Sequence, residues 1–130
     1  MGPCRANLPD GRWHFQHGPI DIVVGAIGAR DEVNLAHQRA WHRFTTVLDE
    51  LVSELPGLRH PIGSECVLQG VIAKRMWNAC APFNSGFITA MAAVAGSVAQ
   101  ELVGQFEAPG IERAWVNNGG DIALVIAPLQ

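Results

Sequence analysis

Residues 113–127 read RAWVNNGGDIALVIA, and this stretch decides the fold around it. Two apolar runs flank four turn-forming residues, Asn117, Asn118, Gly119 and Gly120. An Asn-Gly pair between apolar strands indicates a β-hairpin, because both residues tolerate positive φ. A second interpretation is a loop where a ligand meets bare backbone, since glycines allow close approach and successive N–H groups can hold an anion. Asp121 would then bind a hydroxyl, an amine or a metal, and the stretch alone leaves both interpretations open.

The spacing of apolar residues predicts the other elements. Strands are expected at 12–16 and 20–27, and helices at about 32–55, 66–81 and 90–106. Asp31 and Thr89 are suited to cap helices, and Pro56-Gly57 and Pro82 to end them. Residues 1–11 are expected to form an irregular arm. The order of two strands, three helices and a final hairpin predicts an α+β fold without regular βαβ alternation.

The expected third helix is unusual because almost every side chain from 91 to 99 is small. Such a helix is predicted to be buried all round, with neighbouring backbones or a flat ligand packed closely against it. Gly96 lowers helix stability, so we expect it to have a packing reason.

Composition limits the class of protein. The chain has 130 residues, enough for a single domain, with 48% hydrophobic and 16% charged residues. The net charge is −3 and the nine basic residues are spread along the chain, which argues against nucleic acid or an anionic membrane as partner. The three cysteines have no metal-ligand spacing, and no segment resembles a secretory signal or a membrane span. We therefore expect a cytoplasmic protein.

Several polar residues have an ordinary structural interpretation. Asp21, Lys74 and Arg75 are expected on solvated faces. His37 and His42 are five residues apart, so they do not stack on one helix face and are expected at the surface. A metal hydrolase using His14, His17 or His60, or a nucleophile formed by Cys66 with His60, has no supporting spacing or companion motif.

Three blocks of the chain resemble a known family. They are RANLPDGRWHFQHGPIDIVV at 5–24, FITAMAAVAGSVAQEL at 87–102 and RAWVNNGGDIAL at 113–124. In order and spacing these blocks resemble the uncharacterised ApbE-like proteins, distant relatives of the FAD:protein FMN transferases. The resemblance implies an ApbE-like α+β fold, FAD bound with a divalent metal, usually magnesium, and transfer of FMN to a protein hydroxyl by phosphoryl-transfer chemistry.

The resemblance also implies positions for the ligand. Gly96 matches the glycine of the transferases' Lys-Gly helix, but Ala95 replaces the lysine and Gln100 replaces a flavin-binding aspartate. Glutamine can hydrogen-bond a hydroxyl or an amide, but it cannot act as an anion. Another departure is Ala90, where this family commonly has proline. The candidate flavin-contacting residues are Thr89, Met91, Gly96, Gln100, Asn117, Asn118, Gly119, Gly120 and Asp121.

The transferases' metal-ligating Asp and Thr would lie in a C-terminal half beyond the Gly-Gly-Asp strand. We therefore expect residues 1–130 to form one truncated, incomplete domain, with catalytic and metal residues outside it. The apolar final strand invites pairing, so a homo-oligomer or a complementing C-terminal half is the expected protein partner. The alternative function is a catalytically inactive structural or interaction module of the same fold.

Overall fold

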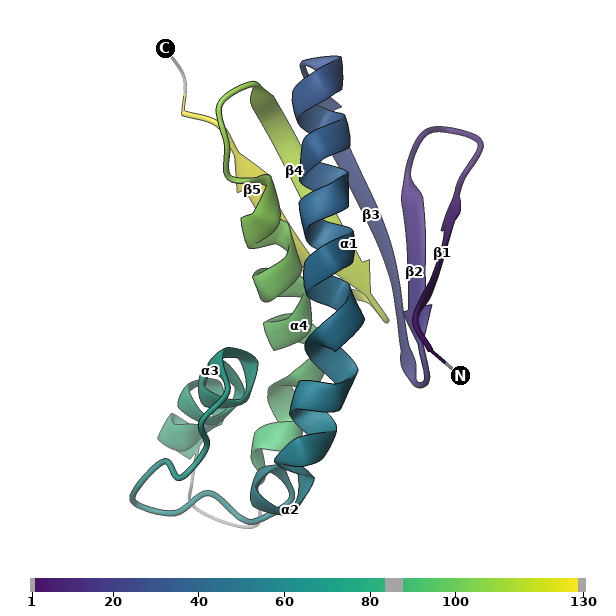
Figure 1. Cartoon of the computed structure of the whole chain (residues 1–130). Helices are drawn as coiled ribbons and strands as arrows, with labels where there is room; N and C mark the ends of the chain where they lie inside the picture. Colours follow the sequence, from purple (N-terminus) through teal and green to yellow (C-terminus); the bar gives the residue numbers. More distant parts are fainter. Residues whose placement is uncertain (1, 84–87, 129–130) are drawn as a thin grey trace.

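The computed structural model describes residues 2–83 and 88–128 and contains one five-stranded antiparallel sheet (Figure 1). The strands are β1 (Cys4–Asn7), β2 (Trp13–His17), β3 (Ile20–Gly28), β4 (Ile111–Asn118) and β5 (Asp121–Ile126). Their order in space follows their order in the chain, and each pairs antiparallel with the next. The α+β expectation is confirmed, and the final hairpin lies at one edge of the sheet.

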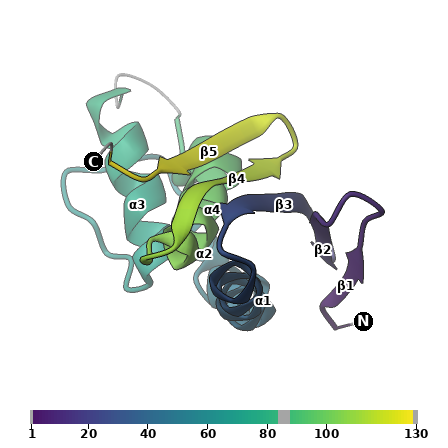
Figure 2. The same cartoon turned by 90° about the horizontal axis from the view of Figure 1, so that it is seen from above.

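The helices cover one face of this sheet (Figure 2). They are α1 (Arg30–Ser53), α2 (Leu55–Leu58), α3 (Val71–Cys80) and α4 (Val94–Val103). Short 3-10 turns occupy Ala81–Phe83, Ala90–Ala93 and Gly104–Phe106. The long α1 packs on β2 and β3, whereas α4 packs on β4 and β5. The sheet and the two helices therefore enclose one core, and α3 flanks α4 beside the β5 edge.

The residues that form the core are spaced along the sequence with two periodicities, one of the strands and one of the helix α1. Alternate strand residues, among them Phe15, Ile22 and Val116, are fully buried on the helix side of the sheet. The α1 residues Ala40, Phe44 and Val47 recur at helical spacing and are also fully buried. The Phe15 ring lies 5.4 Å from the Phe44 ring and 5.3 Å from that of Trp41. These aromatic contacts fix α1 across the β2–β3 half of the sheet.

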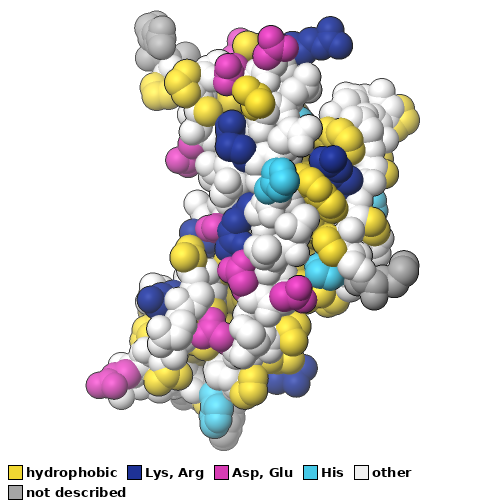
Figure 3. All heavy atoms as spheres, in the orientation of Figure 1, with side chains coloured by type: hydrophobic (Ala, Val, Ile, Leu, Met, Phe, Trp, Pro, Cys, Tyr) yellow, Lys and Arg dark blue, Asp and Glu magenta, His cyan; other side chains and the backbone are white. Residues whose placement is uncertain are grey.

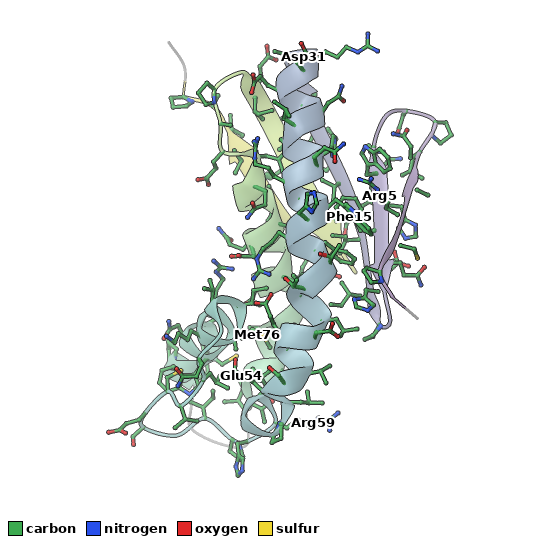
Figure 4. All side chains as sticks on the ribbon, in the orientation of Figure 1. Arg5, Phe15, Asp31, Glu54, Arg59 and Met76 are labelled. Carbon is green, nitrogen blue, oxygen red and sulfur yellow. The ribbon has the colours of Figure 1, made fainter. Side chains whose placement is uncertain are left out.

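The N-terminal segment is not the irregular arm that the sequence predicts. Residues 4–7 form β1, because their backbone extends the sheet through pairing with β2. Arg5 pairs with Phe15, so both side chains lie on the face toward α1 (Figure 4). The Arg5 guanidinium lies 5.2 Å from the Trp13 ring centre and 4.9 Å from that of Trp41. These cation–π contacts stabilise a strand whose sequence has little strand signal.

The helix boundaries differ from the predicted ones because of caps that the sequence did not reveal. The second long helix begins at Val71 and not at 66. The Glu54 carboxylate accepts hydrogen bonds from the backbone N–H of Gln69 at 2.6 Å and of Gly70 at 2.9 Å. A remote acid thus binds the backbone just before α3, and these residues stay non-helical.

Other predicted helix ends also move. Ala29, and not Asp31, occupies the N-cap position of α1, and no side chain caps it. Pro56-Gly57 lies inside the short α2, since α1 has already ended at Ser53. Thr89 precedes the 3-10 turn at 90–93, but its hydroxyl makes no capping bond. The sequence also predicts a loop of small residues at 83–88, of which residues 84–87 lie outside the described residues.

Two burial expectations are wrong. His37 is only 6% exposed, because it lies between Trp13 and Phe106, with its ring centre 6.4 Å and 5.2 Å from theirs. The helix at 94–103 is buried on one side only, at Ser97–Ala99 and at Leu102–Val103, whereas Gly96 and Gln100 are exposed. Small residues therefore do not bury this helix all round.

The second face of the sheet has no helix over it in the described part of the chain (Figure 2). Ile122, Leu124 and Ile126 of β5 are 61%, 59% and 69% exposed there. On the helical face, basic and acidic side chains are interspersed (Figure 3). None of the described helices combines the length and the apolar composition that a bilayer span requires.

Candidate ligand site between α3, α4 and β5

The Gly-rich stretch is a hairpin turn, so that interpretation is confirmed. Its two central residues are Gly119 and Gly120, with φ of 59° and 101°, and not Asn118-Gly119. Asn117 Oδ1 accepts the Gly120 N–H at 3.0 Å, and Asn118 Nδ2 donates to the Ala95 carbonyl at 3.2 Å. Because Asn117 already takes the Gly120 N–H, the turn does not offer the predicted series of free backbone donors. The Asn118 contact instead fixes the hairpin against the start of α4.

An open pocket of about 350 Å³ lies beside this turn. Three elements line it: α3 with Arg75 and Ala79, the 90–103 segment, and the first three residues of β5. Its lining residues are Arg75, Ala79, Ala92, Ala93, Gly96, Ser97, Gln100, Asp121, Ile122 and Ala123. The fold thereby brings together three predicted site residues that are distant in sequence: Gly96, Gln100 and Asp121.

The floor of the pocket is nearly free of side chains. Ala92 and Gly96 are four residues apart and both exposed, and Gln100 follows four residues later at the rim of the pocket. A Cβ atom added at Gly96 would meet nothing within 4 Å. The expected packing reason for this glycine is therefore absent from the described structure. What the glycine provides is open space over a helix backbone, at a cost of about 1 kcal/mol of helix stability.

Arg75 is a further candidate for ligand binding, although the sequence favours a solvated face for Lys74 and Arg75 and gives no independent support for a phosphate contact. Its guanidinium donates to the Ser97 carbonyl at 3.2 Å and to Glu101 Oε1 at 3.1 Å. These two bonds use two of the five guanidinium N–H groups, so others remain to bind a ligand in the pocket. The only sequence signal was the adjacent basic pair Lys74-Arg75, which does not distinguish the two residues.

Glu101 holds this arginine in place. Its other carboxylate oxygen accepts a bond from Arg43 Nε of α1 at 2.8 Å. Burial raises the pKa of Glu101, but hydrogen bonds and charge from Arg43 and Arg75 outweigh burial and hold it below its usual value. The carboxylate is therefore ionised at neutral pH and links α1, α3 and α4 beside the pocket.

Asp121 provides the negative end of the pocket. It faces the helix layer, because its partner Asn118 in the β4–β5 register contacts α4. Its side chain is exposed and makes no hydrogen bond or ion pair within the described residues. The carboxylate is thus not engaged in capping the turn. The pocket combines a guanidinium, an amide and a carboxylate with the exposed small residues Ala92 and Gly96.

The other predicted contacts are not at this site. Met91 and Asn118 line a second, mostly apolar pocket of about 370 Å³ between α1, α2 and α4. Thr89 forms an isolated bridge with Pro61. Asn117, Gly119 and Gly120 belong to the turn and line neither of these pockets. The predicted set therefore divides into two pockets, a turn and the isolated bridge at Thr89.

The histidines do not assemble a metal centre. His14 Nε2 lies 2.6 Å from the exposed Asp21, and His17 is buried in the core. Across residues 2–83 and 88–128, no group of three or more His, Cys, Asp or Glu side chains could hold a metal ion. The resemblance placed the metal ligands outside residues 1–130, so this finding concerns only the histidine-based metal site, which had no supporting spacing in the sequence.

Comparison with known proteins places the chain in a family. A family model described as AbpE bacteria matches residues 5–130. The chain therefore belongs to the AbpE_bact family. AbpE is a different family from ApbE, so the ApbE-like assignment is wrong, and its implications for flavin transfer lose that support. No curated protein matches the chain.

Proposed function

We propose that this protein binds a flat heterocyclic ligand with polar edges, of the flavin nucleotide class, in the pocket between α3, α4 and β5. The observation that supports this most is the bare helix surface at Gly96, where a Cβ would meet nothing within 4 Å. An exposed helical glycine without a packing neighbour costs stability, and close approach of a ring system to the helix backbone offsets that cost.

The polar groups at the rim suit such a ligand. The Gln100 amide can donate and accept at the same time, as the carbonyl and imide groups at the edge of a flavin ring require. Arg75, held by Ser97 and Glu101, is preorganised to bind a phosphate or a carbonyl oxygen. Asp121 can accept bonds from a ligand hydroxyl or N–H group. The pocket volume of about 350 Å³ lies at the small end of ligand sites, which suits the ring part of a nucleotide.

The proposal stops at binding. The expectation of FMN transfer rested on membership of the ApbE-like family, which the match to a different family overturns. Transfer chemistry is therefore no part of the proposed function.

A pair of glycine variants tests the proposal. Gly96 and Gly104 are both exposed, and an added Cβ meets nothing within 4 Å at either position, but only Gly96 lines the pocket. In flavin fluorescence titrations with FMN and FAD, Gly96→Leu should abolish binding, whereas Gly104→Leu should bind like the unmodified chain. Urea unfolding should show that both variants stay folded. Binding that survives Gly96→Leu would refute the site, and absence of binding by the unmodified chain would refute the flavin class.

A second candidate function is protein interaction through the final strand. It is favoured by the position of β5 at the sheet edge and by its three exposed apolar side chains. Edge strands of this composition pair readily with another chain. The pairing strand would come from a second copy of the chain or from another polypeptide.

A further inference from the structure

The β5 edge has free backbone groups at defined positions. The Ala127 N–H donates to the Glu112 carbonyl of β4 at 2.9 Å. In an antiparallel sheet, successive residues direct their N–H and C=O groups to opposite sides of the strand. Residues 121, 123 and 125 therefore bond to β4, like Ala127. Ile122, Leu124 and Ile126 direct their backbone groups away from β4 and outward from the sheet.

From this arrangement we infer that two copies of the chain pair antiparallel along β5, with a twofold axis at Leu124. In this register Leu124 faces Leu124 of the second copy, and Ile122 faces Ile126. Ile122, Leu124 and Ile126 thus each face an aliphatic residue whose backbone groups also point outward. The inference builds on the second candidate function and specifies its partner, its register and its effect on the ligand site.

The side chains of β5 are self-complementary in this register. Residues 122–127 carry no charge, and the outer-face sequence Ile-x-Leu-x-Ile is unchanged when the strand direction is reversed. Cross-strand pairs of aliphatic residues stabilise a sheet, whereas like charges directly opposite would destabilise it. The only acid, Asp121, comes opposite Ala127. The ladder ends beyond these residues, because Pro128 has no N–H to donate.

The other sheet edge is a poorer partner for β5. The strand β1 has four residues and includes Arg5, whose guanidinium is already stacked on Trp13 and Trp41. Pairing of β1 with β5 of another copy would be head-to-tail and would generate open chains of molecules. Self-pairing of β5 closes at two copies and covers both apolar edges at once.

The pairing also changes the ligand site. The pocket is open beside Asp121, Ile122 and Ala123, at the first half of β5. In the inferred register, Val125 of the second copy lies beside Ala123, and Ala127 of the second copy lies beside Asp121, on the helix side of the sheet. These residues provide a wall that a single copy lacks. The dimer therefore contains two ligand sites, and each is completed by the other chain.

Cysteine cross-linking tests the register directly. In a background in which the exposed cysteines are removed (Cys4→Ser, Cys66→Ser), Leu124→Cys should form a disulfide-linked dimer under mild oxidation. Ile122→Cys alone should not, because its copies are four residues apart in register, or about 13 Å at ~3.3 Å per residue, beyond disulfide reach. A mixture of Ile122→Cys and Ile126→Cys chains should cross-link. Efficient self-linkage of Ile122→Cys, or no linkage of Leu124→Cys, would overturn the inference.

Two equally exposed leucines provide the matched control for association. Leu124 is 59% exposed on β5, and Leu35 is 54% exposed on α1. In sedimentation velocity over a wide concentration range, Leu124→Lys should abolish the dimer and Leu35→Lys should retain it. A chain that is monomeric at every concentration would refute the pairing. An equal loss of the dimer in Leu124→Lys and Leu35→Lys would also refute the pairing.

Flavin titrations separate this inference from the proposed function. If the second copy completes the site, Leu124→Lys should weaken FMN binding at least tenfold, and Leu35→Lys should leave it unchanged. Tight binding by a monomeric Leu124→Lys chain would contradict the shared site and leave the proposed function intact. Loss of binding in Gly96→Leu without loss of the dimer is expected, because Gly96 lies on the pocket floor and not at the strand edge.

Discussion

At the scale of single residues, Glu101 has the greatest structural effect near the site. It bonds to Arg43 of α1 and to Arg75 of α3 while belonging to α4. Its carboxylate is mostly buried, with 15% of the side chain exposed. Removing its charge would leave two guanidinium groups close together without their common partner.

We therefore expect Glu101→Gln to lower the free energy of unfolding by about 2 kcal/mol, the usual worth of hydrogen bonds to charged groups. Urea denaturation followed by circular dichroism measures this change. Glu65→Gln is the control, because Glu65 is exposed and makes no ion pair within the described residues. A loss of similar size in the control would show that charge removal in general, and not this bridge, lowers the stability.

His37 gives the protein a pH dependence. Burial lowers the pKa of His37 from its usual 6.5 to about 4, so the folded chain holds this ring neutral at pH 7. The unfolded chain binds the proton first as the pH falls. Stability is therefore highest above pH 6.5 and declines as the pH falls toward 4, by about 3 kcal/mol at 1.36 kcal/mol per pKa unit.

Urea unfolding of the chain and of His37→Phe between pH 7 and pH 5 measures this contribution. The phenylalanine variant should lose most of the pH dependence in this interval. Burial raises the pKa values of Glu101 and Glu50, but hydrogen bonds and charge from arginine hold them below the usual value for a glutamate, so these two residues lose their stabilising charge only at lower pH. Identical slopes for the two proteins would mean that His37 is not the titrating group.

At the scale of elements, the middle of the sheet depends on one close approach between β3 and β4. Gly25 pairs with Trp115, and a Cβ added at Gly25 would overlap the indole ring. The ring can lie flat on the sheet only because the neighbouring position has no side chain.

Gly25→Ala should consequently destabilise the protein by about 1–3 kcal/mol, the usual cost of overpacking, as measured by urea unfolding. Gly63→Ala is the matched control, since a Cβ at Gly63 meets nothing within 4 Å and its φ is not positive. Trp115 fluorescence should also change in the Gly25 variant. Unchanged stability would show that the indole moves aside without cost.

The elements that could be predicted from the sequence are those with a strong period of their own. The α1 stripe at Ala40, Phe44 and Val47 and the alternation of β2 and β3 specify buried faces without outside help. The boundaries that moved depend on remote contacts. Glu54 determines where α3 begins, and the aromatic rings around Arg5 stabilise β1. No local pattern encodes those partners.

In the candidate site, too, only the locally determined features could be predicted from the sequence. The hairpin could be predicted, because turn residues act locally, but its two central residues are Gly119 and Gly120 and not the Asn-Gly pair. The grouping of Gly96, Gln100 and Asp121 in one pocket arises from the packing of α4 on β5. The role of Arg75 was hidden, because only the folded structure places it against Ser97 and Glu101. Met91 and Asn118 were assigned to the same ligand, yet they line another pocket.

At the scale of the whole molecule, the helix-covered face of the sheet and its β5 edge suit two kinds of contact. The helix face contains the candidate ligand pocket, and the β5 edge contains the strand that we infer to pair. Because residues of the inferred second copy line the open side of the pocket, ligand binding and dimer formation are thermodynamically coupled. Each must strengthen the other to the same extent.

Binding alone predicts that FMN at about 100 times its dissociation constant adds roughly 2.7 kcal/mol to the free energy of unfolding. The coupling adds a second prediction. FMN should also shift the monomer–dimer equilibrium toward the dimer. Thermal melts and sedimentation velocity with and without FMN measure the two effects. Stabilisation without any change in association would show that the two copies bind ligand independently.

The most direct test of the central claim, a ligand site on the bare surface of α4, is amide chemical-shift mapping by NMR with FMN added to the isotope-labelled chain. The account predicts the largest shifts at Gly96, Gln100 and Asp121, with small shifts around the second pocket near Leu48 and Val52. Shifts centred on Leu48 and Val52, or no shifts at all, would contradict it.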